Sequence, residues 1–171
     1  MVVLIITLHR IDYCNSLLDS VSDHDLHRFR SIQYTLCQII NRMPRFSREH
    51  MSPHLKALYW LPIKQRIAFK WFVLTFKIVH LGAPSYFSDY FVRHTSAANT
   101  RRSSVDNIFL SREVIPFVRG THKSKTHFDY CFYTNGPVRY NKLPSEIRCA
   151  STISMFRSRL KTYLFNQAYP P

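Results

Sequence analysis

Apolar residues recur through most of the chain at a helical spacing of three or four positions. The most apolar run lies near the middle, and Gly82 is placed to end it. We therefore predict helices over five segments: residues 2–19, 23–43, 53–58, 64–81 and a C-terminal segment capped by Ser151.

The predicted second helix has a defined start and an apolar side. Ser22 is placed as its N-cap and Asp25 at the third helical position, which is the spacing of a capping box. Pro44 ends the helix. The helical period predicts that its buried residues are Leu26, Phe29, Ile32, Leu36, Ile39 and Ile40.

The pattern changes in the second half. Residues 93–107 are polar and predict a loop, whereas residues 108–118 and 128–133 favour strands, with a turn signal at Asn135-Gly136. The predicted fold class is α+β, mainly α, with a helical N-terminal half, a long central helix, a small β element near 108–135 and a C-terminal helix. The predicted divisions are a helical region (1–92), a polar loop (93–107) and a small α+β extension (108–171).

Charge points to a class of partner. The chain carries 24 Lys and Arg against 10 Asp and Glu, a net charge of +14 with a pI near 10.0. Residues 1–41 hold three cations and four acids, so the excess of positive charge lies in residues 42–171. DNA or RNA is the partner that such a charge favours. An anionic membrane is a weaker alternative, because no basic helix has a clean apolar face, and we expect no membrane partner.

Few residues offer catalytic or metal chemistry. The three glycines are too dispersed for a phosphate-binding loop, and no two acids are adjacent, whereas two-metal enzymes use clustered carboxylates. His24/His27 and His50/His54 have ligand-like spacing but no cysteine at a matching distance. We therefore predict no catalytic residue, no metal site and no cofactor, and no enzyme activity of this chain by itself.

The cysteines and the first residues bear on the compartment. The four cysteines are widely spaced and form no C-x-x-C pair. The apolar run at residues 2–8 has no basic segment before it and no cleavage site after it. We expect a nuclear or cytoplasmic protein that is not secreted.

The central helix carries a narrow basic stripe. At about 100° per residue, Arg66, Lys70, Lys77 and His80 fall on one side of a helix that is otherwise apolar. The stripe is either the solvated edge of a core helix or an edge that contacts phosphate groups, because cations fixed on a helix can follow a nucleic-acid backbone.

Two further basic zones lie outside the predicted helices. In the first, arginines alternate with Phe46, a pattern that suits a single strand because guanidinium groups bind phosphate and rings stack on bases. The second centres on a pair of arginines in the polar loop. A solvated charged loop is the alternative for both zones. The candidate nucleic-acid-binding residues are Arg42, Arg45, Arg48, Arg66, Lys70, Lys77, Arg101 and Arg102.

An ordered set of motifs resembles a known family. Residues 10–18 (R-I-D-Y-C-N-S-L-L) are similar to the R-L/I-D-Y-C-N-S/A-L-L signature of reverse transcriptases from LINE-type (non-LTR) retrotransposons, specifically the jockey-like metazoan elements. Residues 50–67 resemble the family's H-I-T-P and L-H-W-L-P segments, and further matches follow in order to about residue 166. Tyr140 departs from the family, which usually has Trp there.

The resemblance implies a thumb and C-terminal extension that follow the polymerase palm, with the family's two-aspartate box upstream of Met1. It implies a truncated, noncatalytic part of an RNA-directed DNA polymerase that binds template–primer or element RNA, with the remainder of a reverse transcriptase as a second partner. The alternative is a structural or protein-interaction remnant that packs on a polymerase core and has no independent activity.

Overall fold

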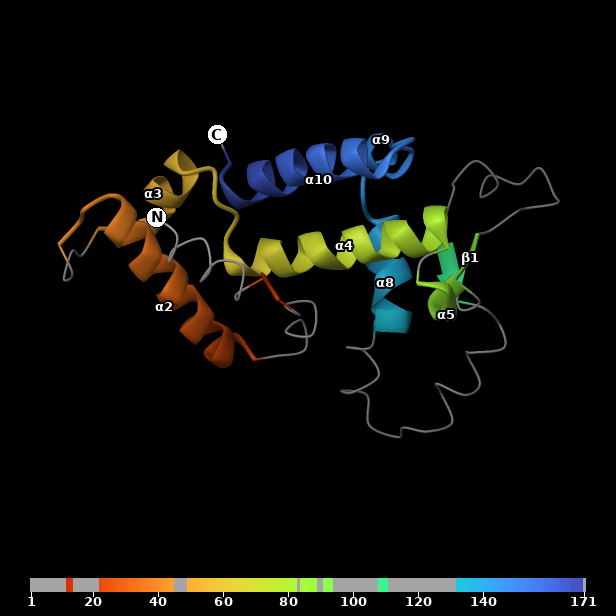
Figure 1. The fold of residues 1–171 in the computed structure, drawn as a ribbon, viewed down its shortest axis with the longest axis horizontal. Helices are drawn as coiled ribbons and strands as arrows, with labels where there is room; N and C mark the ends of the chain where they lie inside the picture. The colour runs from red at the N-terminus through yellow and green to blue at the C-terminus, as the bar shows by residue number, and fades with distance from the viewer. Residues whose placement is uncertain are drawn as a thin grey trace. The chain divides into compact units, whose positions relative to one another are not determined.

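The computed structural model describes residues 12–13, 22–44, 49–82, 84–88, 91–93, 108–110 and 132–170. Its elements are α2 (Asp23–Ile40), α3 (Met51–Ala57), α4 (Ile63–Leu81), α5 (Ser85–Ser88), β1 (Phe91–Arg93), β2 (Ile108–Leu110), α8 (Phe132–Asn141), α9 (Ser145–Arg148) and α10 (Ile153–Ala168) (Figure 1). Helices dominate these residues, so the mainly α prediction is confirmed. The predictions for residues 2–11, 14–19 and 94–107 lie outside the described residues.

Local capping explains the start of α2. Ser22 is its N-cap, and the Oγ atom of Ser22 accepts a hydrogen bond from the backbone N–H of Asp25 at 3.3 Å. The same hydroxyl donates to the Asp25 carboxylate at 2.7 Å, which lowers the pKa of Asp25. The predicted pairing of Ser22 with Asp25 at the helix start is confirmed.

Two other helices begin near, but not at, the predicted residue. α3 begins at Met51, so Pro53 occupies the third helical position, where no N–H is needed within the helix. The cap of the last helix is Thr152 rather than Ser151, because the Oγ1 atom of Thr152 accepts from the N–H of Met155 at 3.2 Å.

α8 stands where a strand and a turn were predicted. Asn135-Gly136 lies inside this helix, and Pro137 follows. Gly136 is buried: a Cβ added there would lie 3.6 Å from the Oγ1 atom of Thr75 on α4 and 3.7 Å from the ring of Phe132. The turn prediction is wrong, because close packing of Gly136 on α4 outweighs the local preference of Asn-Gly for a turn.

β1 and β2 pair antiparallel over three residues each, with Phe91 opposite Leu110 and Arg93 opposite Ile108. Of the β element predicted near 108–135, only Ile108–Leu110 is a strand among the described residues. Strand formation within residues 111–131 stays a prediction, because these residues lie outside the described part.

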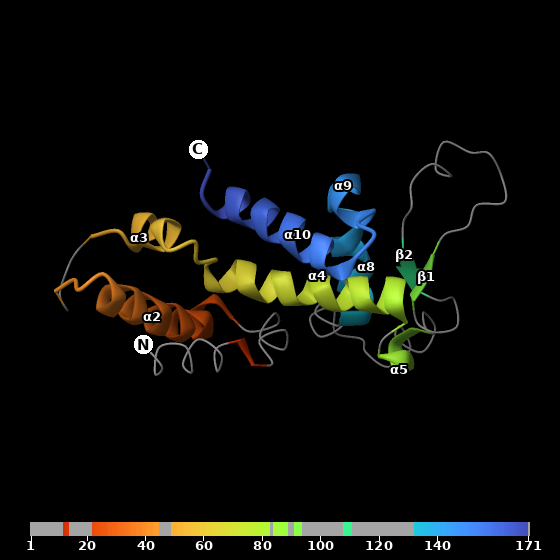
Figure 2. The ribbon, with the colours of Figure 1, turned by 45° about the horizontal axis from the view of Figure 1, so that its top comes forward.

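The chain divides into two compact units, Met1–Lys70 with Arg159–Pro171, and Trp71–Ser158. In the first unit, Cys37, Leu55 and Tyr169 are buried together, and α3 lies beside the C-terminal end of α10 (Figures 1 and 2). This core therefore joins helices that are distant in sequence.

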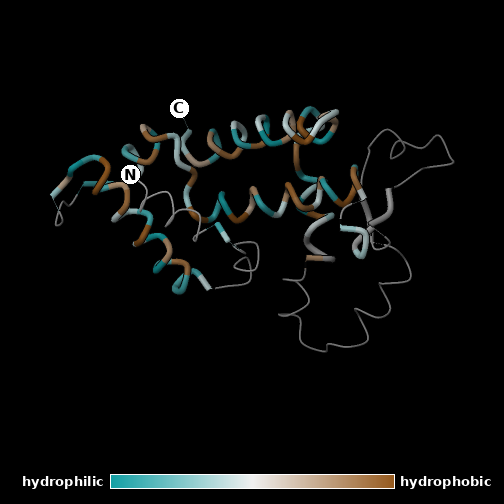
Figure 3. Tube along the Cα trace, viewed as in Figure 1, coloured by the Kyte–Doolittle hydropathy of each residue, from teal (hydrophilic) through white to brown (hydrophobic). Residues whose placement is uncertain are grey.

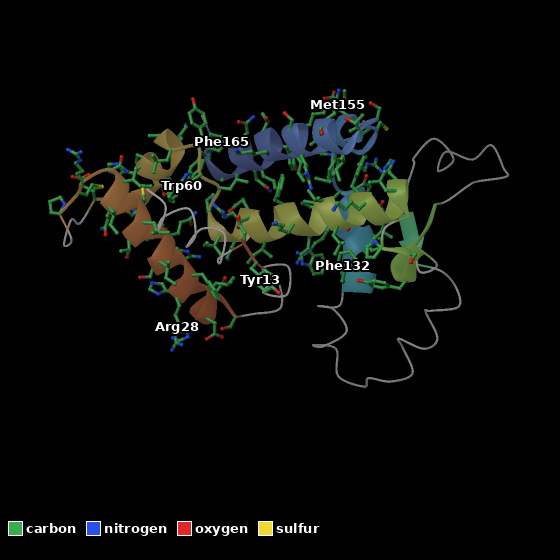
Figure 4. All side chains as sticks on the ribbon, in the orientation of Figure 1. Tyr13, Arg28, Trp60, Phe132, Met155 and Phe165 are labelled. Carbon is green, nitrogen blue, oxygen red and sulfur yellow. The ribbon has the colours of Figure 1, made fainter. Side chains whose placement is uncertain are left out.

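The second unit has an aromatic core. The rings of Phe76 and Phe156 stack with their centroids 4.2 Å apart, and Tyr140 lies 6.2 Å from Phe156. Trp71 is buried, and its ring meets Phe132, labelled in Figure 4, edge-on at 5.0 Å. Tyr140 is 2% exposed, so it belongs to this core.

The buried side of α2 differs from the prediction, which is wrong for Ile32, Ile39 and Ile40: they are 43%, 57% and 37% exposed. Figure 3 shows hydrophobic and hydrophilic residues in alternating bands along this helix. The amide of Gln33 is fully buried and donates to the carbonyl of Leu61 at 2.8 Å. A pattern of apolar residues overlooks such a position, because burial of an amide depends on a partner that is distant in sequence. The buried residues of α2 are Leu26, Gln33, Leu36 and Cys37.

Candidate nucleic-acid interface

The turn that follows α3 places an aromatic residue in an uncommon conformation. Tyr59 has φ +54°, the left-handed region that favours glycine. The N–H of Tyr59 donates to the carbonyl of Lys56 at 3.0 Å, and the N–H of Trp60 donates to the carbonyl of Leu55 at 2.9 Å. These two bonds form a Schellman motif, in which Tyr59 takes the position that glycine usually occupies.

Two side chains that are distant in sequence, Tyr169 and Gln33, hold this turn. The hydroxyl of Tyr169, just after α10, donates to the carbonyl of Trp60 at 2.9 Å. The Gln33 amide from α2 donates to the next carbonyl, that of Leu61. Two successive carbonyls of the turn are therefore fixed from outside it, which restrains the backbone beside Tyr59.

The core beneath the turn excludes water from titratable groups. Burial raises the pKa of Tyr169 to about 12, and the neighbouring Tyr34 and Cys37 act in the same direction. Burial also raises the pKa of the Cys37 thiol. Trp60 and Phe165, both labelled in Figure 4, pack against this core. The turn thus packs against a buried apolar core.

The first turn of α4 is joined to Asp12 by an ion pair. The Nε–H group of Arg66 donates to Asp12 Oδ1 at 2.9 Å, and its Nη2 group donates to Asp12 Oδ2. The two side chains are 17% and 28% exposed. Because the pair is bidentate and largely shielded, Asp12 compensates the charge of Arg66.

A second ion pair engages a lysine at the same end of α4. The ammonium group of Lys64 lies 2.7 Å from the Asp23 carboxylate and lowers the pKa of Asp23 through a hydrogen bond and its charge. Both side chains are more than half exposed. Lys64 is therefore ion-paired with Asp23 of α2.

An open cleft of about 360 Å³ adjoins these groups. Its aromatic lining comes from Tyr59, Trp60 and Phe69, and its cations are Arg66, Lys70 and Lys161. Asp12 also lines it, so three cations stand against one carboxylate. Lys70 and Lys161 are exposed, and neither has an ion-pair partner among the described residues. The cleft thus combines a positive charge with flat aromatic rings.

The predicted site residues divide between this cleft and other places. Arg66 and Lys70 both line the cleft. Arg42 is exposed at the end of α2, and Lys77 is half-buried in the second unit. The remaining candidates lie outside the described residues: Arg45, Arg48, Arg101 and Arg102.

The histidine of the predicted basic stripe is exposed, and its ring also packs on the second unit's core. The ring of His80 stacks on Phe76 with centroids 4.2 Å apart, and its Nε2 atom lies 3.3 Å from the hydroxyl of Tyr140. His80 therefore supports the second unit's core. The role of Lys77, on the same helix, stays a prediction.

The sequence candidates did not include the aromatic residues of the cleft, Tyr59, Trp60 and Phe69, or its third cation, Lys161. A signal for Tyr59 exists, because the third helix must end before Pro62 and no glycine is available to close it. Nothing comparable marks Lys161, which is one of several cations on the last helix. Its place in the cleft depends on a tertiary contact.

Other chemistry is not assembled in the described part of the chain. No three His, Cys, Asp or Glu side chains within it are grouped so that they could hold a metal ion. Within the same residues, no helix is both long and apolar enough to cross a membrane. Comparisons with protein-family models, curated proteins and solved structures find no match to this chain.

Proposed function

We propose that this chain is a C-terminal region of a LINE-type reverse transcriptase that binds nucleic acid and is noncatalytic by itself. The ordered motifs over residues 8–166 support the family, and the net charge of +14 supports a polyanionic partner. In this proposal the region comprises a helical thumb-like part and an extension with a small β element. It acts in the nucleus or cytoplasm beside the remainder of the polymerase.

The observation that carries the proposal is the cleft of the first unit. Lys70 and Lys161 are exposed there without acidic partners among the described residues, beside exposed aromatic surface. Ammonium groups in this setting suit phosphate oxygens, and aromatic rings suit bases. Arg66 also lines the cleft. The further proposed nucleic-acid contacts are Arg42, Arg45, Arg48, Lys77, Arg101 and Arg102.

The test measures affinity for nucleic acid as a function of salt. Each phosphate contact makes log K fall by about 0.7–0.9 per log unit of salt. The double change Lys70→Gln/Lys161→Gln should therefore reduce the slope by about 1.4–1.8 for the full chain. Fluorescence anisotropy with a labelled 15-nucleotide strand and a labelled duplex, over a salt series, measures both slopes.

The matched control removes the same charge elsewhere. Lys142 and Arg157 are exposed and do not line the cleft, so Lys142→Gln/Arg157→Gln should leave the slope close to that of the parent. Equal slopes for the parent and the Lys70/Lys161 variant would reject the cleft as a phosphate contact. A parent chain that does not bind either probe would reject the proposed function itself.

A structural role is the second candidate. Ile32 and Ile39 lie seven residues apart on one face of α2, and they are 43% and 57% exposed. An apolar face of this kind suits packing on a polymerase core that another part of the protein supplies. Concentration-dependent self-association that Ile32→Asn/Ile39→Asn abolishes, together with nucleic-acid binding that does not respond to salt, would favour this candidate.

A further inference from the structure

The position of Tyr59 is not explained by stability. A bulky side chain is disfavoured at φ +54°, and glycine would close the Schellman motif without that strain. Tyr59 is also 72% exposed, so burial of its ring compensates little. Residues held in such conformations are concentrated at binding and active sites, so the contacts of this ring bear on its role.

The ring of Tyr59 is supported on one side. It stacks on Phe165 with centroids 5.8 Å apart and an interplanar angle of 24°. Phe165 in turn meets the ring of Tyr169 edge-on at 5.0 Å, and Tyr169 holds the carbonyl of Trp60. A fixed backbone and a backing ring therefore hold a largely exposed aromatic surface in place.

Cations stand around the same cleft. Tyr59 shares its lining with Lys70 from α4 and Lys161 from α10. The volume of about 360 Å³ falls in the range of small-ligand sites, about 300–1,000 Å³. Such a cleft can receive one unpaired nucleotide, whereas the base faces of a duplex are covered by their neighbours.

We infer that Tyr59 is a stacking platform for one unpaired base of a single-stranded nucleic acid, whose adjacent phosphates are bound by Lys70 and Lys161. This inference rests on the proposed function and adds to it a specific residue and a preference for unpaired bases. Stacking on a tyrosine tolerates any base, because every base offers a π-face. The site therefore reads whether a strand is unpaired and not its sequence.

The test changes the ring and retains the backbone conformation. Asparagine tolerates the left-handed region, so Tyr59→Asn removes the ring without requiring the turn to change. We expect this variant to bind a labelled 15-nucleotide thymidine strand about 5- to 150-fold more weakly than the parent. Its affinity for a 15-base-pair duplex should stay within about twofold, since paired bases do not reach the ring.

Three controls make the result specific. Tyr59→Phe retains the ring and should retain single-strand affinity. Tyr86→Asn removes a second exposed tyrosine, on α5, and should leave binding unchanged. An abasic strand should bind the parent and Tyr59→Asn equally, because it retains phosphates and lacks bases. Circular dichroism and thermal melting establish that each variant is folded.

The outcomes separate this inference from the proposed function. A parent that binds both probes, with Tyr59→Asn folded and unchanged on the single strand, overturns the stacking platform and leaves the proposed function standing. Equal losses on single strand, duplex and abasic strand also overturn it, because they indicate a general effect on binding. Failure of the parent to bind any probe overturns both.

Discussion

Two helix ends in the first unit are closed by residues other than glycine. Arg42, with φ +52°, follows the C-cap of α2 as Tyr59 follows that of α3. The N–H of Arg42 donates to the carbonyl of Ile39 at 3.2 Å, and the N–H of Met43 donates to that of Gln38 at 2.9 Å. The chain has only three glycines, of which Gly82 closes α4 at φ +59°. A basic and an aromatic side chain thus occupy positions that glycine would fill with less strain.

Tyr169 offers a prediction about pH at the scale of one residue. Burial raises its pKa to about 12, whereas an unfolded tyrosine has a pKa of about 10. The stability that this proton contributes is therefore present below pH 10 and is lost as the pH rises toward 12. We expect the free energy of unfolding to fall over this window. Urea denaturation of the parent at a series of pH values measures it.

The variant Tyr169→Phe isolates that residue from Cys37, whose pKa burial also raises. At neutral pH it should lose about 1 kcal/mol, because the carbonyl of Trp60 loses its hydrogen bond. Its stability should then decline less than that of the parent above pH 10. Parallel curves for the two proteins would contradict the assignment of the alkaline transition to Tyr169.

At single residues, contacts between near neighbours in the sequence were predictable and long-range contacts were not. Ser22 and Asp25 were predicted correctly, because a helix N-terminus is determined by residues three positions apart. The burial of Gln33 and the ion pair of Arg66 with Asp12 were not predicted. Their partners lie 28 and 54 positions away, and no local pattern reports such distances.

At the scale of elements, long periodic helices were the predictable part. α4 begins within one residue of its predicted start and ends at the predicted residue, since its apolar run has Pro62 before it and Gly82 after it. α8 was not predicted. Its sequence contains an Asn-Gly pair and Pro137, and only packing on α4 accounts for a helix there.

Gly136 distinguishes the helix from the predicted turn. An added Cβ would meet its nearest neighbours at 3.6–3.7 Å, which is ordinary van der Waals contact. Alanine should therefore fit, and Gly136→Ala should stabilise the protein by about 0.5–1 kcal/mol through helix propensity. The melting temperature should rise by roughly 1–4 °C. A decrease would contradict the helix and favour a turn, in which alanine at positive φ is strained.

At the scale of the whole molecule, the sequence predicts the net charge well, but it does not predict which cations lie together in the fold. The excess of cations follows from counting, and it indicates a polyanionic partner without indicating where that partner binds. Arg66 and Lys70 were selected from one helix face and do line the cleft. Lys161 reaches the same cleft from the C-terminal helix, a contact that depends on the tertiary fold of the first unit.

The proposed function predicts that the chain binds a template–primer and adds no nucleotides to the primer. Two-metal polymerases hold their ions with clustered carboxylates, and the closest acids in this sequence are Asp23 and Asp25. Both are engaged at the start of α2, Asp23 by Lys64 and Asp25 by Ser22.

We therefore expect the purified chain to retain a labelled RNA–DNA template–primer on a filter and to add no nucleotide to it with Mg²⁺ or Mn²⁺. An active reverse transcriptase on the same substrate is the positive control. The Lys70→Gln/Lys161→Gln variant should retain less template–primer than the parent at low salt, and the difference should narrow as salt is raised. Primer extension above the no-protein background would contradict a noncatalytic role, because the proposal assigns no pair of carboxylates to metal-ion binding.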